Sequence, residues 1–364
     1  MASTIIKIEI CIKDEDYSME NLLITIAAAF LGGFLLQKLR VPGGMMLGSV
    51  LTVALLNINT SLVDIPPEFR FLAQCIAGAY IGMTVKRENF GRLKDLVRPI
   101  LVLLGGLFAT NVLVGILIYL VSPLDLLTSF LCGIPGGISD TPLIAADLGA
   151  DATKVTVLQF VRLISGIGMI PLLVKREKGR GASQPSGQQE LIEKKEPPFG
   201  TPKLWISLAV ALLGGLLGKN LGIPAGTLLF AMISILLLKM LHVEVTFPIW
   251  FKRLAQLFSG AYIGSHFGYQ DFLELKFLLI PALILVGFNL LACYLLGHYI
   301  SVKFAIPLSQ AILSSSPAGA SDMALIASDL GVSGSDVAMI QIARLIGAIS
   351  IFPQIFNFVS QWFS

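Results

Sequence analysis

A strongly apolar segment interrupted by Pro135, Gly136 and Gly137 constrains this chain most, because the segment occurs twice. The copies run from 133 to 171 and from 315 to 353, and they superimpose without a gap. The polar residues inside them recur 182 positions apart, as the pairs Ser139/Ser321, Asp140/Asp322, Asp147/Asp329, Gln159/Gln341 and Arg162/Arg344. The sequence therefore predicts two copies of one structural unit.

The Pro-Gly-Gly interruption predicts a broken helix. Proline lacks an amide hydrogen and glycine tolerates most backbone angles, so one helix ends there and another begins at a new angle. The second copy keeps the break as Pro317, Ala318 and Gly319. At membrane depth, such a break persists only where it is packed in protein or lines a wet cavity. Paired breaks in two repeats are typical of a secondary transporter's binding site.

The composition indicates a multi-spanning, all-α membrane protein. The 364 residues are 55% hydrophobic and 13% charged, with a mean hydropathy of +0.82, well beyond the usual values for soluble domains. The formal net charge of +3 gives no reason to expect a nucleic-acid partner. The partners we expect are the lipid bilayer and an ion or small-molecule substrate.

Six apolar runs occur in the first half, most of them near the ~20 residues needed to span a bilayer. They lie at about 21–39, 43–60, 67–85, 96–121, 124–149 and 153–174. The predicted organisation is a polar tail (1–20), a first membrane repeat (21–174), a charged linker (175–202) and a second membrane repeat (203–358). The scattered cysteines and histidines match no disulfide, metal or cofactor pattern, so we expect no metal, no cofactor and no enzyme activity.

Loop charges predict that the two repeats are inverted. The loop at 86–98 is rich in Lys and Arg, whereas its counterpart holds only Lys276. Conversely, the loop at 61–70 holds one Arg, and the region around its counterpart holds Lys239, Lys252 and Arg253. Because short cytoplasmic loops carry the Lys and Arg excess, equivalent loops lie on opposite sides. Inversion needs an odd number of crossings, so either the Pro-Gly-Gly segment is re-entrant or the first two runs do not both cross. We expect about five crossings per repeat.

Asp140 and Asp147 lie seven residues apart, on one face of a helix. One interpretation is structural: Ser139 or Asp140 caps the half-helix, and Asp147 lies at its exit beside Gly149. The other is that Asp140 and its counterpart Asp322 bind a proton or cation beside unwound carbonyls.

Arg162 and Arg344 fall about nine residues into their apolar helices, where a charge costs about 2.5–3.5 kcal/mol. Gln159 and Gln341 lie one turn earlier on the same faces. Either an Arg–Asp pair clamps the crossing, or the arginines bind an anionic substrate or release a carboxylate during transport.

Gln74 and Gln256 begin two stretches with the pattern Gln-x3-Gly-Ala-Tyr-x-Gly. Their glycines predict close helix packing, and the Gln side chains are weaker candidates for the site. Tyr80 and Tyr262 are candidates for hydrogen bonds between helices. The glycine pairs at 32–33 and 214–215 leave a homodimer open.

At PGGISD, AADLGAD and MIPLL the sequence resembles the crossing-helix signature of the sodium/bile-acid symporter-like and cation/proton antiporter-like superfamily. Over about residues 21 to 358, the duplicated pattern resembles the bacterial AbrB duplication membrane proteins, to which ammonia monooxygenase and AbrB regulator labels are attached. The resemblance implies an inner-membrane protein whose core of crossed, broken helices moves against a panel domain. It also implies alternating-access transport, coupled to a proton or to sodium.

Carried over to this chain, the resemblance implies an ion site at Ser139, Asp140, Ser321 and Asp322, with Gln74 and Gln256 as contributors. Aspartate stands where the symporters have Asn or Glu, which makes a proton at least as good a candidate as sodium. The alternative is a membrane-embedded regulatory protein that affects gene expression indirectly.

Overall fold

The computed structural model is all-α, with no strand among the residues it describes. It describes residues 19–39, 41, 43–60, 63, 65–85, 89–178, 202–223, 225–241, 243, 245, 247–319, 323, 327 and 332–363. The first repeat forms α1 (Met19–Lys38), α2 (Gly44–Thr60), α3 (Pro67–Thr84), α4 (Asn89–Val121), α5 (Leu126–Gly133), α6 (Asp140–Asp147) and α7 (Ala152–Lys178). The second forms α8 (Pro202–Asn220), α9 (Gly226–Met240), α10 (Ile249–Ser265), α11 (Tyr269–Glu274), the 3-10 turn η1 (Leu275–Leu278), α12 (Leu279–Phe304), α13 (Leu308–Ser315) and α15 (Gly334–Phe363).

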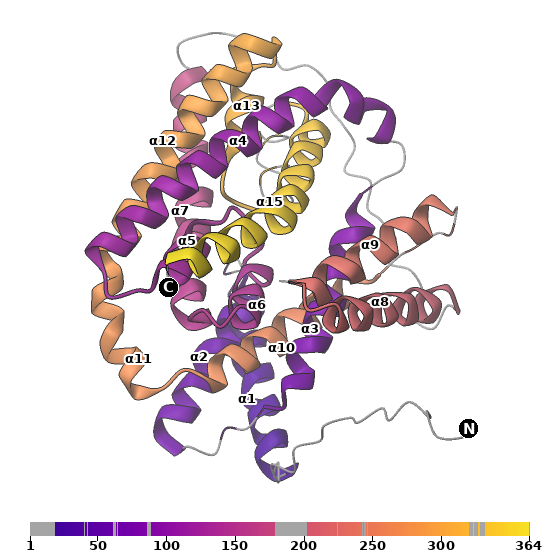
Figure 1. Cartoon of the computed structure of the whole chain (residues 1–364), viewed down its shortest axis with the longest axis vertical. Coiled ribbons are helices and arrows are strands. Elements are labelled where there is room, and N and C mark those ends of the chain that lie inside the picture. Colours follow the sequence, from indigo (N-terminus) through magenta and orange to yellow (C-terminus); the bar gives the residue numbers. More distant parts are fainter. Residues whose placement is uncertain are drawn as a thin grey trace.

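The helices match the predicted apolar runs closely (Figure 1). Most of the predicted tail and linker, residues 1–18 and 179–201, lie outside the described residues. The predicted linker begins too early, however, because α7 continues to Lys178.

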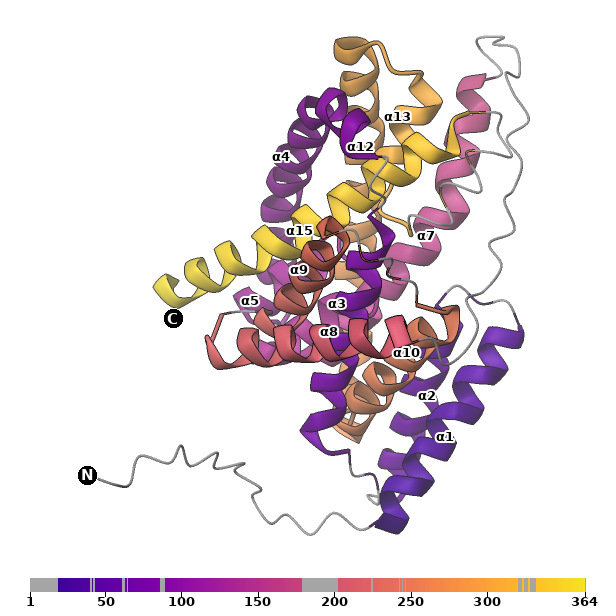
Figure 2. The same ribbon diagram turned by 90° about the vertical axis from the view of Figure 1, so that its right-hand side faces the viewer.

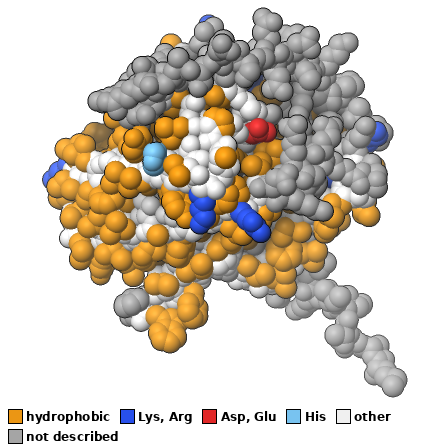
Figure 3. Space-filling model, turned by 90° about the horizontal axis from the view of Figure 1, so that it is seen from above, with side chains coloured by type: hydrophobic (Ala, Val, Ile, Leu, Met, Phe, Trp, Pro, Cys, Tyr) orange, Lys and Arg blue, Asp and Glu red, His pale blue; other side chains and the backbone are white. Residues whose placement is uncertain are grey.

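Five of the described helical segments are long and apolar enough to cross a membrane. They are Met19–Lys38, Leu96–Val121, Ala152–Ile170, Tyr269–Phe304 and Asp336–Trp362. Large apolar side chains cover their outer surfaces: Leu31 is 67% exposed, Leu120 70% and Leu283 67%. Figure 3, a view of the molecule from above, shows hydrophobic side chains over much of the described surface and a few charged ones near the centre. This surface is the one expected of a protein surrounded by lipid.

The predicted helix break is confirmed in both copies. In the first, α5 ends at Gly133 and α6 begins at Asp140, so the Pro-Gly-Gly segment is non-helical. In the second, α13 ends at Ser315. Helices α5 and α6 have eight residues each, about 12 Å, and neither alone crosses a hydrocarbon core about 30 Å thick.

The third helix of each repeat packs on the second helix of the other repeat, α3 on α9 and α10 on α2. The predicted glycines make this approach close. A Cβ atom at Gly78 would lie 2.3 Å from the carbonyl oxygen of Leu228, and one at Gly260 would lie 2.7 Å from that of Met46. Gly78 and Gly260 are equivalent residues, and so are Met46 and Leu228, so the two contacts are copies of each other.

The same internal symmetry extends to side chains. Asn57 donates to the carbonyl oxygens of Ser265 and Phe267, at the end of α10. The equivalent residue, Lys239, donates to the equivalent carbonyls at the end of α3. Helices α4 and α12 pack together and run in opposite directions (Figure 1), and α7 and α15 likewise point opposite ways in Figure 2. These directions are those that inverted repeats require.

The glycine pairs at 32–33 and 214–215, which had suggested a possible homodimer, pack against other helices of the same chain. A Cβ atom at Gly32 would lie within 2.6 Å of Thr52 and Gly48 on α2, and one at Gly214 would lie 2.1 Å from Ser234 on α9. These glycines therefore lend no support to a dimer.

Candidate functional site

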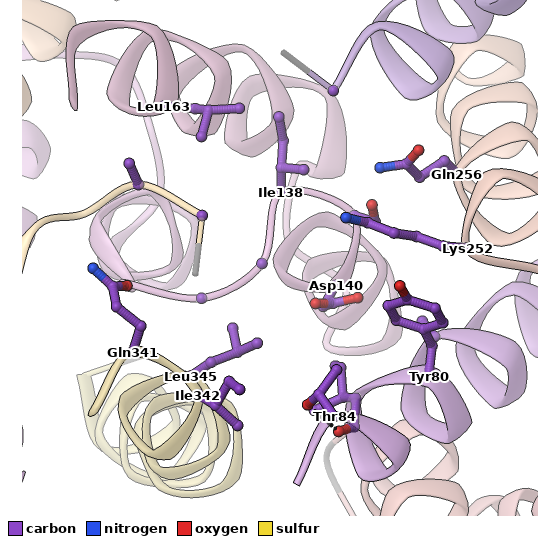
Figure 4. A pocket seen from close by; sticks show the side chains of 18 of the residues that line it. Tyr80, Thr84, Ile138, Asp140, Leu163, Lys252, Gln256, Gln341, Ile342 and Leu345 are labelled. Atoms are coloured by element: carbon purple, nitrogen blue, oxygen red, sulfur yellow. Dashed lines mark hydrogen bonds between the residues drawn. The ribbon is translucent and has the colours of Figure 1, made fainter. Parts of the chain in front are cut away.

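The two helix breaks bound one cavity of about 280 Å³. The first break contributes Gly136, Gly137, Ile138, Ser139 and Asp140, and the second contributes Pro317, Ala318 and Gly319. The remaining walls come from α3 (Ala77, Tyr80, Ile81, Thr84), α7 (Arg162, Leu163), α10 (Lys252, Ala255, Gln256) and α15 (Gln341, Ile342, Arg344, Leu345), together with Gly43. Figure 4 shows the labelled side chains converging on this space from opposite sides. Segments far apart in the sequence thus share one chamber, which has charged side chains in mainly apolar walls.

The two buried arginines hold the broken ends of the helices. Arg162 donates to the carbonyl oxygens of Ile134 and Gly136, the latter at 2.8 Å. Arg344 donates to the equivalent oxygens of Ser316 and Ala318. A break frees helix carbonyls that lipid cannot satisfy. At each break, the planar guanidinium group of one arginine donates to two of these carbonyls. This arrangement explains why a buried arginine follows each break.

Among the described residues, Arg162 has no aspartate partner for the predicted Arg–Asp clamp, and Asp322 and Asp329 lie outside the described residues. The Arg162 guanidinium bonds to backbone carbonyls and forms no ion pair with a described carboxylate. The physical reason is proximity: Arg162 lies beside the freed end of α5, whereas Asp140 begins the next half-helix.

Gln159 and Gln341, one turn before the two arginines, also donate to carbonyl oxygens at the helix breaks. Gln159 donates to the carbonyl oxygens of Leu131, Cys132 and Ile134 at 3.1–3.3 Å. Gln341 donates to those of Leu313 and Ser316 at 2.7 and 3.2 Å. Gln341 also lines the cavity, but Gln159 does not. Gln159 is therefore a support for the broken helix, not a wall of the cavity.

Asp140 is the first residue of α6 and is only 7% exposed. The expected cap at this position is wrong, because Ser139 makes no side-chain capping bond. Instead, the Asp140 carboxylate points into the cavity (Figure 4). It forms no hydrogen bond or ion pair with any residue in the described ranges. The hydroxyl of neighbouring Thr141 is also buried without a described partner. Asp140 is thus a buried carboxylate available to a ligand.

Lys252 reaches the cavity from α10 and is exposed at its rim. Its ammonium nitrogen lies 5.9 Å from the centre of the Tyr80 ring, a cation–π contact. From the sequence, Lys252 was interpreted only as a loop charge and not as a residue of the site. The available signal was that the equivalent residue in the first repeat, Arg70, is also basic.

Gln74 lies outside this cavity, contrary to the expectation that it contributes to the ion site. It donates to Asp147 at 2.6 Å and to the carbonyl oxygen of Leu143 at 3.3 Å. Its counterpart Gln256 does line the cavity. Asp147 lies at the end of α6 as predicted, two residues before Gly149, whose φ of +74° ends the helix.

The remaining expected residues have mixed outcomes. Pro135 borders a small separate space with Asn111. Ser139 lines the main cavity, and its carbonyl oxygen accepts from Ser259 at 3.3 Å. Ser321 and Asp322 lie outside the described residues. Over the described part of the chain, no three His, Cys, Asp or Glu side chains are grouped so that they could hold a metal ion.

The fold and this cavity define a class: an all-α, multi-spanning membrane protein with a chamber that contains charged side chains between two helix breaks. The chain belongs to the AbrB family, described as transition state regulatory protein AbrB, whose sequence model matches residues 3–175 and 60–360. It is 27% identical to the protein named "Uncharacterized protein YhjN" of Bacillus subtilis (strain 168), over 95% of this chain and 94% of that protein. It is 26% identical to the protein named "Putative regulator AbrB" of Escherichia coli (strain K12), over 91% of this chain and 93% of that protein.

Proposed function

We propose that the protein is a secondary transporter of the bacterial cytoplasmic membrane, which moves a small anionic solute by alternating access with a coupled proton or sodium ion. The observation that supports this most is the cavity bounded by both helix breaks. Ionisable groups buried in a membrane protein are costly and are typical of ion and substrate pathways. Here Asp140, Arg162 and Arg344 all line one such space.

The charges around the cavity favour an anionic solute. Among its described lining residues, Arg162, Lys252 and Arg344 are cationic and Asp140 alone is anionic. The volume of about 280 Å³ lies just below the range of about 300–1,000 Å³ typical of drug-sized ligands. A small organic or inorganic anion therefore fits both the charge and the size.

Asp140 is the residue we assign to the coupling ion. Its carboxylate faces the cavity without a hydrogen-bond or ion-pair partner among the described residues, so it can take up a proton or a cation when the solute binds. A cation at Asp140 offsets the charge of an anion held nearby, which links the two binding events. The enzyme interpretation has no support of this kind, and we propose that the protein is not an enzyme.

The test begins with ligand binding. Purified protein is screened by thermal shift against small carboxylates, phosphate and sulfate, since a ligand that binds only the folded state raises its stability. The strongest anion is then followed into proteoliposomes with an imposed proton or sodium gradient. We expect gradient-driven uptake in the unaltered protein. Failure to bind or take up any anion would contradict the proposal.

Asp140→Asn separates coupling from binding. The substitution keeps the shape of the side chain but removes its charge, so we expect anion binding to persist and the dependence of uptake on the gradient to disappear. Glu68→Gln, at an exposed position on α3, is the matched control and retains both properties. Gradient-driven uptake that survives in Asp140→Asn would remove this residue from the coupling role.

The names of the family and of the Escherichia coli relative favour a second candidate function, regulation of gene expression. We infer that any such effect is indirect and follows from transport of a signal metabolite. Asp140→Asn then abolishes the regulatory effect together with coupled uptake. An effect that persists without transport favours a membrane-embedded regulator, for which the charged linker is the candidate binding segment.

A further inference from the structure

A compact cluster of four side chains closes the face of the molecule at the other end of α3 from Thr84 and the cavity rim. We call it the Arg70 cluster: Arg70, Gln74, Asp147 and Tyr262. Arg70 pairs with Asp147 at 3.3 Å and donates to the hydroxyl oxygen of Tyr262 at 3.4 Å, with its guanidinium 5.4 Å from the centre of that ring. Gln74 donates to the second carboxylate oxygen of Asp147 at 2.6 Å.

The cluster joins two groups of helices. Arg70 and Gln74 lie on α3 and Tyr262 lies on α10, within the group formed by α1–α3 and α8–α10. Asp147 ends α6, which packs on α7 in the group that carries the broken helices. Arg70 also donates to the carbonyl oxygen of Ala146 on α6, at 3.2 Å. Relative movement of the two groups at this end of the molecule therefore requires these contacts to separate.

The internal duplication relates the residues of the Arg70 cluster to residues that line the cavity. The residues equivalent to Arg70, Gln74 and Tyr262 are Lys252, Gln256 and Tyr80. All three of these equivalents line the cavity near its rim. The same three positions thus line the cavity at one end of the molecule, whereas at the other end Arg70 and Gln74 bind Asp147 and Tyr262 accepts a hydrogen bond from Arg70.

The inverted repeats place these two sets at opposite ends. The cavity follows the C-terminal half of α3 and the N-terminal half of α10, whereas the Arg70 cluster uses the N-terminal half of α3 and the C-terminal half of α10. The C-terminus of helix α3 leads to the basic segment 86–98, which includes the start of α4 and which the charge rule assigns to the cytoplasm. The cavity then opens inward, and the Arg70 cluster closes the outward face.

We infer that the Arg70 cluster is the closed gate of a second entrance to the same cavity. This inference rests on the proposed transport function. The Arg70 and Asp147 side chains are 28% and 19% exposed, so water screens their attraction and the pair can separate and re-form. Separation of Arg70 from Asp147 opens the outward entrance, while the rim around Lys252 and Tyr80 narrows.

A matched pair of cysteine substitutions tests the gate without measuring transport. Ala255 lines the open cavity, and its equivalent Ala73, next to Gln74 on α3, is fully buried. Ala255→Cys and Ala73→Cys proteins are treated in vesicles with a membrane-impermeant maleimide, and the chain with its native cysteines supplies the baseline. We expect labelling of Ala255→Cys from the inner side and little labelling of Ala73→Cys from either side.

Breaking the contacts of the Arg70 cluster should make Ala73→Cys accessible from the outer side. With Arg70→Gln or Asp147→Asn added, we expect the rate of labelling of Ala73→Cys from the outer side to rise about fivefold or more, the lower end of common coupling strengths. The double substitution should add little beyond either single one, because both remove the same contact. Arg98→Gln removes an exposed arginine from α4 and should leave labelling unchanged.

The outcomes separate the gate from the transporter. Unchanged labelling of Ala73→Cys in both Arg70→Gln and Asp147→Asn overturns the gate, whether or not the protein transports. Increased labelling in a protein that transports nothing supports the gate and contradicts the proposed function. If Arg70→Gln does not fold, Gln74→Ala removes one bond to Asp147 and gives the same test with a smaller rise.

Discussion

Each buried arginine of this protein bonds the end of a broken helix. Arg162 and Arg344 donate to equivalent pairs of carbonyl oxygens, and both are at most 3% exposed. A helix that ends inside a membrane leaves carbonyl groups with no water to bond. A charged, planar side chain with several donors satisfies two of them at once. The high cost of burying the charge is thereby offset, and the break gains a fixed geometry.

Replacing either arginine by lysine should weaken the fold. Lysine keeps the charge but loses the fork that reaches two carbonyls, so we expect Arg162→Lys and Arg344→Lys each to lower the free energy of unfolding by about 1–3 kcal/mol. Thermal unfolding of the purified protein measures this change. Arg98→Lys, at an exposed position, is the control. Equal stability of all three variants would show that the carbonyl bonds contribute little.

The pairing of Arg162 with backbone carbonyls could not be predicted from the sequence. Recurrence marked Arg162 and Gln159 as important, and hydrophobicity placed them deep in a helix. A freed carbonyl carries no residue signature, however, so the only visible partner for an arginine was an aspartate. The contact of Arg70 with Asp147 was missed for a related reason, since the two residues lie on different helices and 77 positions apart.

At the scale of elements, close packing of α3 on α9 depends on Gly78. Its missing side chain lets the carbonyl oxygen of Leu228 approach to 2.3 Å from where a Cβ atom would lie. Helices can approach each other this closely only through small residues. The packing is repeated by Gly260 of α10 against Met46 of α2.

Gly78→Ala and Gly105→Ala should therefore have opposite effects. A Cβ atom at Gly78 meets backbone, so we expect a loss of about 1–3 kcal/mol in stability. A Cβ atom at Gly105 on α4 would have no heavy atom within 4 Å, and alanine there should stabilise the helix by up to about 1 kcal/mol. Thermal unfolding in one detergent compares them. A neutral Gly78→Ala would mean that α3 and α9 separate easily.

The helix positions and both breaks were predictable from hydrophobic runs and from proline and glycine. The helix on which each of them packs was not predictable. The Gly-x3-Gly pattern predicts that something packs closely on α3, but it does not say that this is α9 of the other repeat. Exchange of helices between repeats depends on the whole arrangement of the chain, and local sequence carries no mark of it.

At the scale of the whole molecule, the basic N-terminal end of α4 and the short helix α11 lie at opposite ends of the fold (Figure 1). They are equivalent segments of the two repeats, so inversion places them on opposite sides of the membrane. Arg98→Cys and Lys276→Cys, both at exposed positions, should then react with an impermeant thiol reagent from opposite sides of sealed vesicles. Reaction of both from one side would rule out inverted repeats.

The exchanged packing also predicts that the halves need each other. A chain split between residues 185 and 186 leaves α3 without α9 and α10 without α2. We expect each half to be degraded when it is expressed alone, and the two halves to copurify when they are expressed together. Gly78→Leu in the first half should abolish copurification, whereas Gly105→Leu should not. A first half that is stable alone would contradict this prediction.

The exchange of α3 and α10 also bears on how such a chain arises. Each half contributes one helix to its partner's scaffold, so the covalent connection supplies mainly a high local concentration of one half near the other. One shorter polypeptide, inserted into the membrane in both orientations, could therefore pair with a second copy in antiparallel fashion and form the same exchanged packing. In the present chain the two halves differ at equivalent positions, as where Arg70 of one half corresponds to Lys252 of the other.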